Sequence, residues 1–126
     1  MIYGIGTDIV EPSRIKQSLE KHGERFARRL LAEYEWSDYM KAPKPALFLA
    51  KRFAAKEALS KAMGTGFRFP VTLNNIAVTH TPLGKPYFQF HPELAELIRR
   101  EGIVSHHLSL SDELNLASAF VILEKA

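Results

Sequence analysis

The sequence contains no cysteine, one tryptophan and no apolar run near the roughly 20 residues that a membrane-spanning helix needs. Without cysteine, a disulfide, a thiolate nucleophile and a cysteine-ligated zinc or iron–sulfur site are all excluded. Any metal ion must therefore be held by oxygen or imidazole ligands. The N-terminus also lacks the basic and apolar regions of a signal peptide, so we expect a cytoplasmic protein with no membrane partner.

Length and composition are those of an ordinary globular protein. The 126 residues, 46% hydrophobic and 25% charged, predict one domain over residues 1–126. The net charge of +3 is modest, but basic residues concentrate early in the chain. They are Arg14, Lys16, Lys21, Arg25, Arg28 and Arg29, with Glu20 and Glu24 between them. This cluster favours an acidic partner, either a nucleic acid or an acidic protein.

The chain is organised around a predicted helix from about Ala46 to Met63. Pro43 and Pro45 precede it and Gly64 and Gly66 follow it, so both ends are well marked. A rotation of about 100° per residue gives this helix two faces. The face expected to pack contains Phe48, Ala55, Ala58, Leu59 and Ala62. The face expected to be charged contains Lys56, Glu57, Ser60 and Lys61, with Arg52 at the border.

Glu57 and Lys61 are spaced one helical turn apart, so a carboxylate and an ammonium project side by side. Two interpretations are open from this spacing. The pair is either an ordinary salt bridge on a solvated face, worth about 0.3–0.5 kcal/mol, or part of a phosphate and metal site.

The first ten residues have the alternation of a strand, and Asp8 shares a face with Gly4 and Gly6. A lone acid near the end of an apolar strand must be solvated, paired or bound to a metal ion, because burying an unpaired carboxylate is costly. The glycines leave space for another group to approach. If the central helix packs over the end of this strand, Asp8 and Glu57 meet as two oxygen ligands, and with water and phosphate oxygens they suit Mg²⁺. Lys61 would then face the same anion.

The remaining chain predicts short helices and strands. A turn at Glu11–Ser13 leads into a helical stretch with Ile15, Leu19, Phe26 and Leu30 inward, interrupted near Gly23. A second helical piece, about 33–40, packs Tyr34, Trp36 and Tyr39, and a third covers about 93–100. Strands are expected at 76–79, 87–90, 103–111 and 117–123. Lys85 lies near the tip of the connection between the first two strands, and His107 lies on the polar row of the third.

Four strings together resemble the signature of the holo-acyl-carrier-protein synthases, a family of phosphopantetheinyl transferases. They are GIGTDIVE at 4–11, RFAAKEALSKAMGTG at 52–66, PLGKPY at 82–87 and HLSLSDE at 107–113. The similarity extends over nearly the whole chain. It implies an α+β fold in which a small, mainly antiparallel sheet packs against the long central helix. It also implies a homotrimer with active sites between subunits.

The resemblance further implies the activity. Family members transfer 4′-phosphopantetheine from coenzyme A to a serine of apo acyl carrier protein, in fatty acid biosynthesis, and release adenosine 3′,5′-bisphosphate. By motif, Asp8 and Glu57 bind Mg²⁺ and Lys61 serves the phosphates. Residues that match the coenzyme-binding surroundings are Arg52, Lys61, Gly64, Thr65, Gly66, Lys85, Pro86, His107 and Ser109. Residues that match the helix contacting the acidic carrier protein are Arg14, Arg25 and Arg28.

Two residues depart from the family pattern. Leu116 stands where an aromatic residue is frequent, and Pro12 interrupts a usually apolar stretch. We interpret both as packing variation that leaves the predicted metal pair untouched. Two other functions are less favoured. One is an RNA-binding domain that uses the basic region Arg14–Arg29, but the sequence lacks the interleaved basic and aromatic residues expected on its strands. A purely structural trimer leaves Asp8, Glu57 and Lys61 unexplained.

Overall fold

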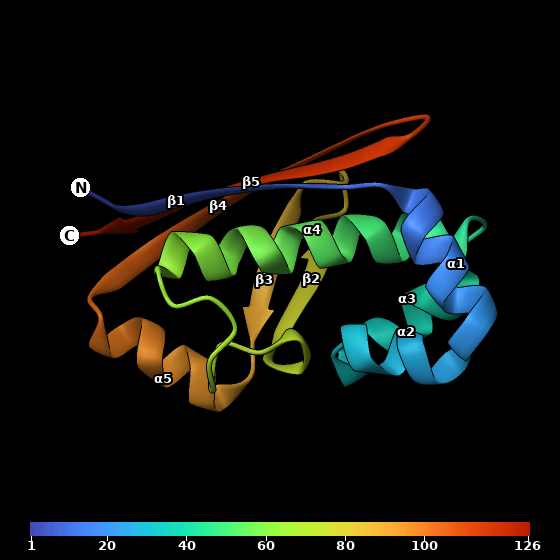
Figure 1. Ribbon diagram of the computed structural model, residues 1–126. Helices are drawn as coiled ribbons and strands as arrows, with labels where there is room; N and C mark the ends of the chain where they lie inside the picture. The colour runs from blue at the N-terminus through green and yellow to red at the C-terminus, as the bar shows by residue number, and fades with distance from the viewer.

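The longest helix, α4 (Pro45–Met63), lies against one face of an antiparallel sheet in the computed structural model, which describes residues 1–126 (Figure 1). The sheet has the strand order β1–β5–β4, formed by β1 (Ile2–Val10), β4 (Ile103–Glu113) and β5 (Leu116–Lys125). A separate two-stranded sheet is formed by β2 (Ile76–His80) and β3 (Pro86–Phe90). The expected strands are confirmed, and β2, β3, β4 and β5 are each longer than predicted.

The other helices lie at the two ends of α4. The N-terminal group consists of α1 (Pro12–His22), α2 (Glu24–Leu30), the 3₁₀ turn η1 (Glu33–Glu35) and α3 (Trp36–Lys41). The turn η2 (Leu73–Asn75) precedes β2, and α5 (Pro92–Arg100) connects the two sheets (Figure 1). The break at Gly23 is confirmed, whereas the single helical piece expected at 33–40 is split into η1 and α3. None of these helices is long and apolar enough to cross a membrane.

Two glycines allow β1 to lie directly on α4. A Cβ atom at Gly4 would overlap the carbonyl oxygen of Ala62, and a Cβ atom at Gly6 would overlap the carbonyl oxygen of Ala58. The small residues Ala58 and Ala62 are themselves buried on the helix side of this contact. Strand and helix backbones therefore approach as closely as sterics allow, with Asp8 one strand repeat beyond Gly6 on the same face.

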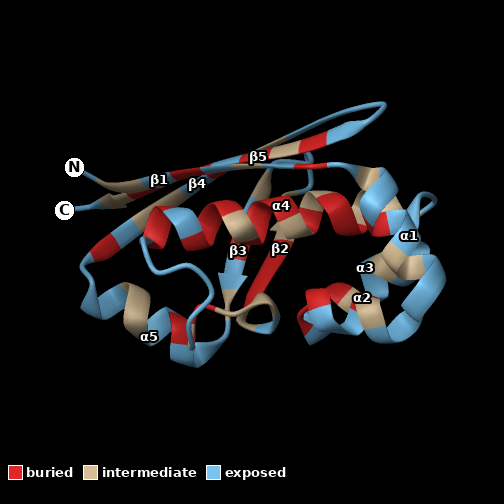
Figure 2. Cartoon of the chain, viewed as in Figure 1, coloured by how far each residue is buried: buried red, intermediate tan, exposed pale blue.

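Helix α4 is buried on almost all sides, as Figure 2 shows along most of its length. The prediction of one packed and one charged face is therefore wrong for three residues. Lys56 and Ser60 are buried rather than exposed, and Arg52 is buried rather than marginal. The reason is that α4 packs against β1 and β5 on one side and against α1, α2, α3 and β2 elsewhere, so no broad solvated face remains.

The predicted aromatic packing in the N-terminal group is confirmed in part. Trp36 and Tyr39 pack against the core, with ring centroids 5.2 Å apart. Tyr34 is exposed, so its expected packing role is wrong. The reason is that η1 turns Glu35, not Tyr34, into the interior.

The outer face of the large sheet carries apolar side chains that no element of the chain covers. Ile5 is 58% exposed, Ile9 66% and Phe120 40%. Register pairs Ile5 with Ile122, and Thr7 with Phe120, so these side chains form adjacent rows. His107 and Ser109, which pair with Ile122 and Phe120, extend the same rows on β4.

The glycine contact gives a first prediction. We expect Gly6→Ala to lower the free energy of unfolding by about 2 kcal/mol, because the added methyl group must displace the backbone of α4. Urea unfolding of the full chain measures this loss. Thr7→Ala, which trims the next side chain on the opposite face of β1, is the matched control and should change stability much less. Equal stability of Gly6→Ala and the unsubstituted protein would contradict the close approach.

Candidate active site

One cavity of about 540 Å³ brings together residues from β1, α1, α4 and the β4–β5 turn. Asp8 enters it from β1, Glu57 from α4 and Arg14 from α1. The remaining wall is formed by Ile9, Val10, Glu11, Ile15, Phe53, Asn115 and Leu116. Two carboxylates that are distant in sequence therefore share one opening, as the strand and helix patterns together predicted.

Lys61 joins this site through Asp8 rather than through Glu57. Its Nζ donates to the backbone oxygen of Thr7 at 3.0 Å and lies 3.3 Å from Oδ1 of Asp8. The ordinary helix-surface salt bridge between Glu57 and Lys61 is not formed. The ammonium is about half exposed, so it remains accessible to an anion at the mouth of the cavity.

The electrostatics of Glu57 reflect its position. Partial burial is the main cause that raises the pKa of the Glu57 carboxyl, and the nearby charge of Asp8 raises it further, while Lys61 opposes both. Ionised Asp8 and Glu57 thus repel each other across the cavity. A cation between them would relieve this repulsion.

The donor set fits Mg²⁺ better than a transition metal. No group of three or more His, Cys, Asp or Glu side chains is arranged to hold a metal ion. Zinc prefers at least three protein ligands, including nitrogen or sulfur, whereas Mg²⁺ usually takes one or two carboxylates and completes its shell with water and substrate phosphates. Asp8 and Glu57 are such a pair.

The glycine-rich turn follows Lys61 directly. Gly64 adopts a left-handed conformation (φ 78°, ψ 8°) that ends α4, and its N–H donates to the Lys61 carbonyl at 3.0 Å. The Gly66 N–H donates to the Ser60 carbonyl at 3.3 Å, and Thr65 Oγ1 donates to the Gly66 carbonyl at 2.7 Å. The turn is therefore a hydrogen-bonded C-terminal cap of α4, three residues after Lys61. No other atom lies within 4 Å of the position that a Cβ of Gly64 or Gly66 would take.

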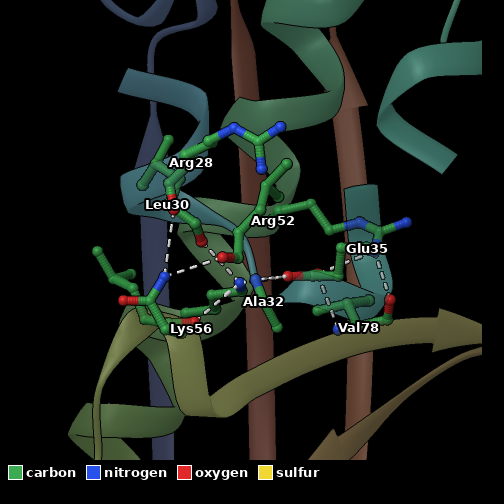
Figure 3. A network of polar contacts seen from close by, with 10 residues as sticks. Arg28, Leu30, Ala32, Glu35, Arg52, Lys56 and Val78 are labelled. Carbon is green, nitrogen blue, oxygen red and sulfur yellow. Dashed lines mark hydrogen bonds and ion pairs between the residues drawn. The ribbon is translucent and has the colours of Figure 1, made fainter. Parts of the chain in front are cut away.

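Arg52 does not reach the Asp8–Glu57 cavity. It belongs to a buried network with Glu35 and Lys56, drawn in Figure 3. Arg52 Nη1 donates to Glu35 Oε2 at 2.9 Å and to the carbonyl oxygen of Val78. Lys56 Nζ donates to Glu35 Oε1 at 2.5 Å, to the Leu30 carbonyl at 2.7 Å and to the Leu73 carbonyl at 3.0 Å.

This network is fully hydrogen-bonded, because Glu35 also accepts the backbone N–H groups of Ala32 (2.8 Å) and Val78 (2.9 Å). Burial nevertheless lowers the pKa of Lys56 to about 8, although the Glu35 carboxylate opposes that shift. The network ties η1, η2 and β2 to α4. It is a structural cluster that the sequence analysis did not find.

Arg52 does border a second, smaller cavity of about 270 Å³. Lys44, Lys51, Arg52 and His80 line it, and two of these cations are already paired, Lys51 with Asp112 at 3.3 Å and Arg52 with Glu35 at 2.9 Å. Burial, Arg52 and Lys51 lower the pKa of His80, which is consistent with a positive local potential.

His107 and Ser109 lie on the opposite face of the sheet from Asp8. Their register partners are the outer-row residues Ile122 and Phe120, whereas Asp8 pairs with the buried Ala119. His107 Nε2 lies 2.6 Å from Oε1 of Glu124 on this outer face. The His107 and Ser109 side chains therefore do not enter the cavity of Asp8 and Glu57 in the same chain.

Lys85 lies in the turn of the β2–β3 hairpin, and Pro86 is the first residue of β3. Neither lines the cavity of Asp8 and Glu57. Of the predicted coenzyme-binding residues, only Lys61 contacts one of the two carboxylates, at Asp8. The 64–66 turn follows it at the end of α4, and the others lie elsewhere.

The predicted carrier-binding arginines differ in their surroundings. Arg14 lines the carboxylate cavity and pairs with Glu11 at 3.4 Å on the surface. Arg25 is exposed and makes no ion pair. The Arg28 guanidinium lies 3.9 Å from the centroid of the Trp36 ring and 3.5 Å from Glu24.

The sequence analysis missed part of the cavity wall. Phe53 lies four residues before Glu57 on α4, so helical spacing alone places it on the same side. Asn115 enters from the β4–β5 turn, which no local pattern connects to Asp8. Leu116 also lines this cavity, because β5 runs beside β1 and brings it there. Its interpretation as packing variation that leaves the carboxylates untouched stays a prediction.

Comparison with known proteins decides the family. The model of the 4′-phosphopantetheinyl transferase superfamily matches residues 4–115. The chain belongs to this superfamily. The holo-[acyl-carrier-protein] synthase of Nitrosospira multiformis is 71% identical over 99% of this chain and 100% of its own length. That of Nitrosomonas eutropha is 68% identical with the same coverage.

Solved structures agree with this assignment. The holo-[acyl-carrier-protein] synthase of Neisseria meningitidis superposes on this transferase with a TM-score of 0.97 at 49% identity, over 99% of this chain and 100% of the other. The Bacillus anthracis synthase, solved in complex with CoA (3′,5′-ADP), gives 0.83 at 37% identity over 100% and 99%. The predicted family, α+β fold and transferase class are confirmed, and the RNA-binding and scaffold alternatives are not favoured.

Proposed function

We propose that this superfamily member transfers 4′-phosphopantetheine from coenzyme A to a serine of apo acyl carrier protein, with Asp8, Glu57 and Lys61 as its catalytic residues. The observation that carries the proposal is the shared cavity of Asp8 and Glu57, with the Lys61 ammonium beside Asp8. The complex of the Bacillus anthracis neighbour with CoA (3′,5′-ADP) supports coenzyme A as the donor. The products are holo acyl carrier protein and adenosine 3′,5′-bisphosphate.

Asp8 and Glu57 would hold one Mg²⁺, which when bound screens the charge of the coenzyme pyrophosphate. The serine oxygen forms a bond to the phosphorus that carries the pantetheine, and the bond from that phosphorus to the bisphosphate oxygen breaks. The contact of the Lys61 ammonium with Asp8 supports a role for Lys61 in neutralising charge on the leaving phosphate. Glu57 lines the cavity beside Asp8, and this position supports it as the acceptor of the serine proton, directly or through water.

The expected coenzyme contacts divide between two faces of the sheet. Lys61 and the turn Gly64–Gly66 lie on the side of the carboxylates, whereas His107 and Ser109 lie on the outer face. A site built from both faces needs two chains. This division, together with the uncovered Ile5, Ile9 and Phe120, supports a homotrimer with active sites between subunits.

Arg52 and the turn residues Lys85 and Pro86 stay in the proposal as coenzyme contacts. The support for Arg52 is its place in the motif at 52–66 and the position of Lys44, which makes no ion pair, in the same cavity. We further propose that residues 1–126 form one domain, because their buried apolar side chains form one cluster. A cytoplasmic location remains a prediction.

The central test is the reaction itself. Incubation with apo carrier protein, coenzyme A and Mg²⁺ should give a phosphopantetheine adduct on the carrier by mass spectrometry, and EDTA should prevent it. We expect Glu57→Gln to lower the rate by at least about a hundredfold at saturating Mg²⁺, because it removes a ligand charge and the proton acceptor. Glu96→Gln, an exposed change on α5, is the control and should retain the rate. Normal turnover by Glu57→Gln would refute the assigned role.

The second test concerns the carrier surface. We expect Arg14→Glu to raise the KM for carrier protein about tenfold and to leave the KM for coenzyme A within about twofold, because the charge reversal repels an acidic partner. Steady-state kinetics with each substrate varied separately measure both values. Arg99→Glu on α5 is the control for charge alone. Equal losses for the two substrates would show that Arg14 is not specific to the carrier.

The third test is the assembly state. Light scattering coupled to size-exclusion chromatography should give three times the 14.3 kDa mass of the chain. Phe120→Glu, which places a charge on the uncovered sheet face, should shift the protein towards the monomer and reduce turnover. An active monomer would contradict the proposed intersubunit site.

A further inference from the structure

The β2–β3 hairpin is held from both sides at a single cross-strand pair. Val78 of β2 and Phe88 of β3 are register partners. On the β2 side, Glu35 accepts the Val78 N–H at 2.9 Å and Arg52 donates to the Val78 carbonyl (Figure 3). On the β3 side, the Phe88 N–H donates to Nε2 of His106 at 3.0 Å. Side chains thus take the places that neighbouring strands would occupy.

These contacts matter because a two-stranded sheet is marginally stable alone. The Glu35–Arg52 pair fixes β2 to η1 and α4, and the His106 contact fixes β3 to β4 of the large sheet. The two contacts therefore secure the hairpin on both sides of the Val78–Phe88 pair, in addition to the packing of Val78 and Phe88 in the core.

The direction of the hydrogen bond defines the state of His106. A backbone N–H only donates, so Nε2 accepts, and the neutral ring carries its proton on Nδ1. The ring packs against Phe88 and Phe90, with centroids 5.3 and 5.4 Å away. Burial, and secondarily the charge of His107, lower the pKa of His106 below its ordinary value of 6.5 and so favour the accepting form.

The surroundings of His106 contain few charges. β3 presents the two phenyl rings, and β5 presents Leu123 as the register partner. On its own strand, the titratable neighbour is His107, which pairs with Glu124 on the other face of the sheet at 2.6 Å. No carboxylate is therefore in position to stabilise a protonated His106.

We propose that His106 is a positioning residue for coenzyme A, acting through the backbone of Phe88. Pro86 lies two residues before Phe88 on β3, and Lys85 closes the turn by accepting the Thr81 N–H at 2.9 Å. Fixing Phe88 therefore fixes the turn that carries both predicted coenzyme contacts. This role rests on the proposed function, because Lys85 and Pro86 are coenzyme contacts only within it.

The test compares two substitutions at this residue. His106→Phe keeps an aromatic ring against Phe88 and Phe90 but removes the acceptor, whereas His106→Gln supplies an amide oxygen at similar reach. We expect His106→Phe to raise the KM for coenzyme A about tenfold with kcat within about twofold, and His106→Gln to return the KM to within about threefold of the unsubstituted value. His91→Gln, on an exposed histidine, is the matched control.

A second measurement does not depend on activity. The Phe88 amide of the unsubstituted protein should exchange its hydrogen slowly, and at least about tenfold faster in His106→Phe. ¹⁵N spectra should show His106 as the neutral Nδ1–H tautomer at about pH 7. A protonated ring or an Nε2–H tautomer in the unsubstituted protein would overturn the clamp even if the variants fail to fold.

The pH dependence has a defined sign. Because the folded protein holds the pKa of His106 below 6.5, the contact is complete above that value. As pH falls below it, the unfolded chain takes up the proton first, so the stability that the contact contributes decreases. When pH falls past the lowered pKa of the folded protein, the ring itself takes up a proton on Nε2 and the contact is lost. The ratio of the coenzyme KM of His106→Phe to that of the unsubstituted protein should therefore shrink towards one as pH is lowered.

The outcomes separate the two proposals. If the unsubstituted protein transfers no phosphopantetheine, the proposed function fails, and amide exchange still decides whether His106 clamps the hairpin. If transfer occurs and His106→Phe accelerates exchange without raising the coenzyme KM, the contact is merely structural and the positioning role is overturned. Unchanged exchange would overturn the clamp itself.

Discussion

The close contact between β1 and α4 is the constraint on which the site depends. Gly4 and Gly6 let the strand lie against the carbonyl oxygens of Ala58 and Ala62, and any side chain there would push the two elements apart. Gly6, which contacts Ala58, lies two residues before Asp8 on the strand, and Ala58 is next to Glu57 on the helix. The contact therefore brings Asp8 and Glu57 to one cavity. The positions of the two carboxylates therefore depend on the absence of side chains at Gly4 and Gly6.

The central helix is held from its other side by charges that water does not reach. Glu35, Arg52 and Lys56 are buried, yet each makes several hydrogen bonds, and together they connect η1, η2 and β2 to α4. Removing one of the three side chains would leave an uncompensated buried charge. This would lower the stability of the fold more than replacing all three with apolar residues of similar volume. Glu57, which is partly buried, follows Lys56 directly on the helix that these contacts hold in place.

Local patterns predicted much of this arrangement. Proline and glycine marked the ends of α4, strand alternation placed Asp8 beside Gly4 and Gly6, and the polar row of β4 contained His107. Lys56 and Ser60 were assigned to the wrong environment because helical periodicity describes one buried stripe, whereas α4 is surrounded by packed elements. The cavity wall from Asn115 and Leu116, and the partnership of His106 with Phe88, depend on pairing between distant strands, which no short window of sequence contains.

The large sheet carries different functional residues on its two faces, with Asp8 on the inner one and His107 and Ser109 on the outer one. Under the proposed assembly, one subunit supplies the acids and its neighbour supplies the histidine and serine. A chain defective in Glu57 and a chain defective in His107 would then complement each other when mixed, since some interfaces would join the two intact halves. Complementation between alleles of such an enzyme would follow from strand alternation together with this assembly.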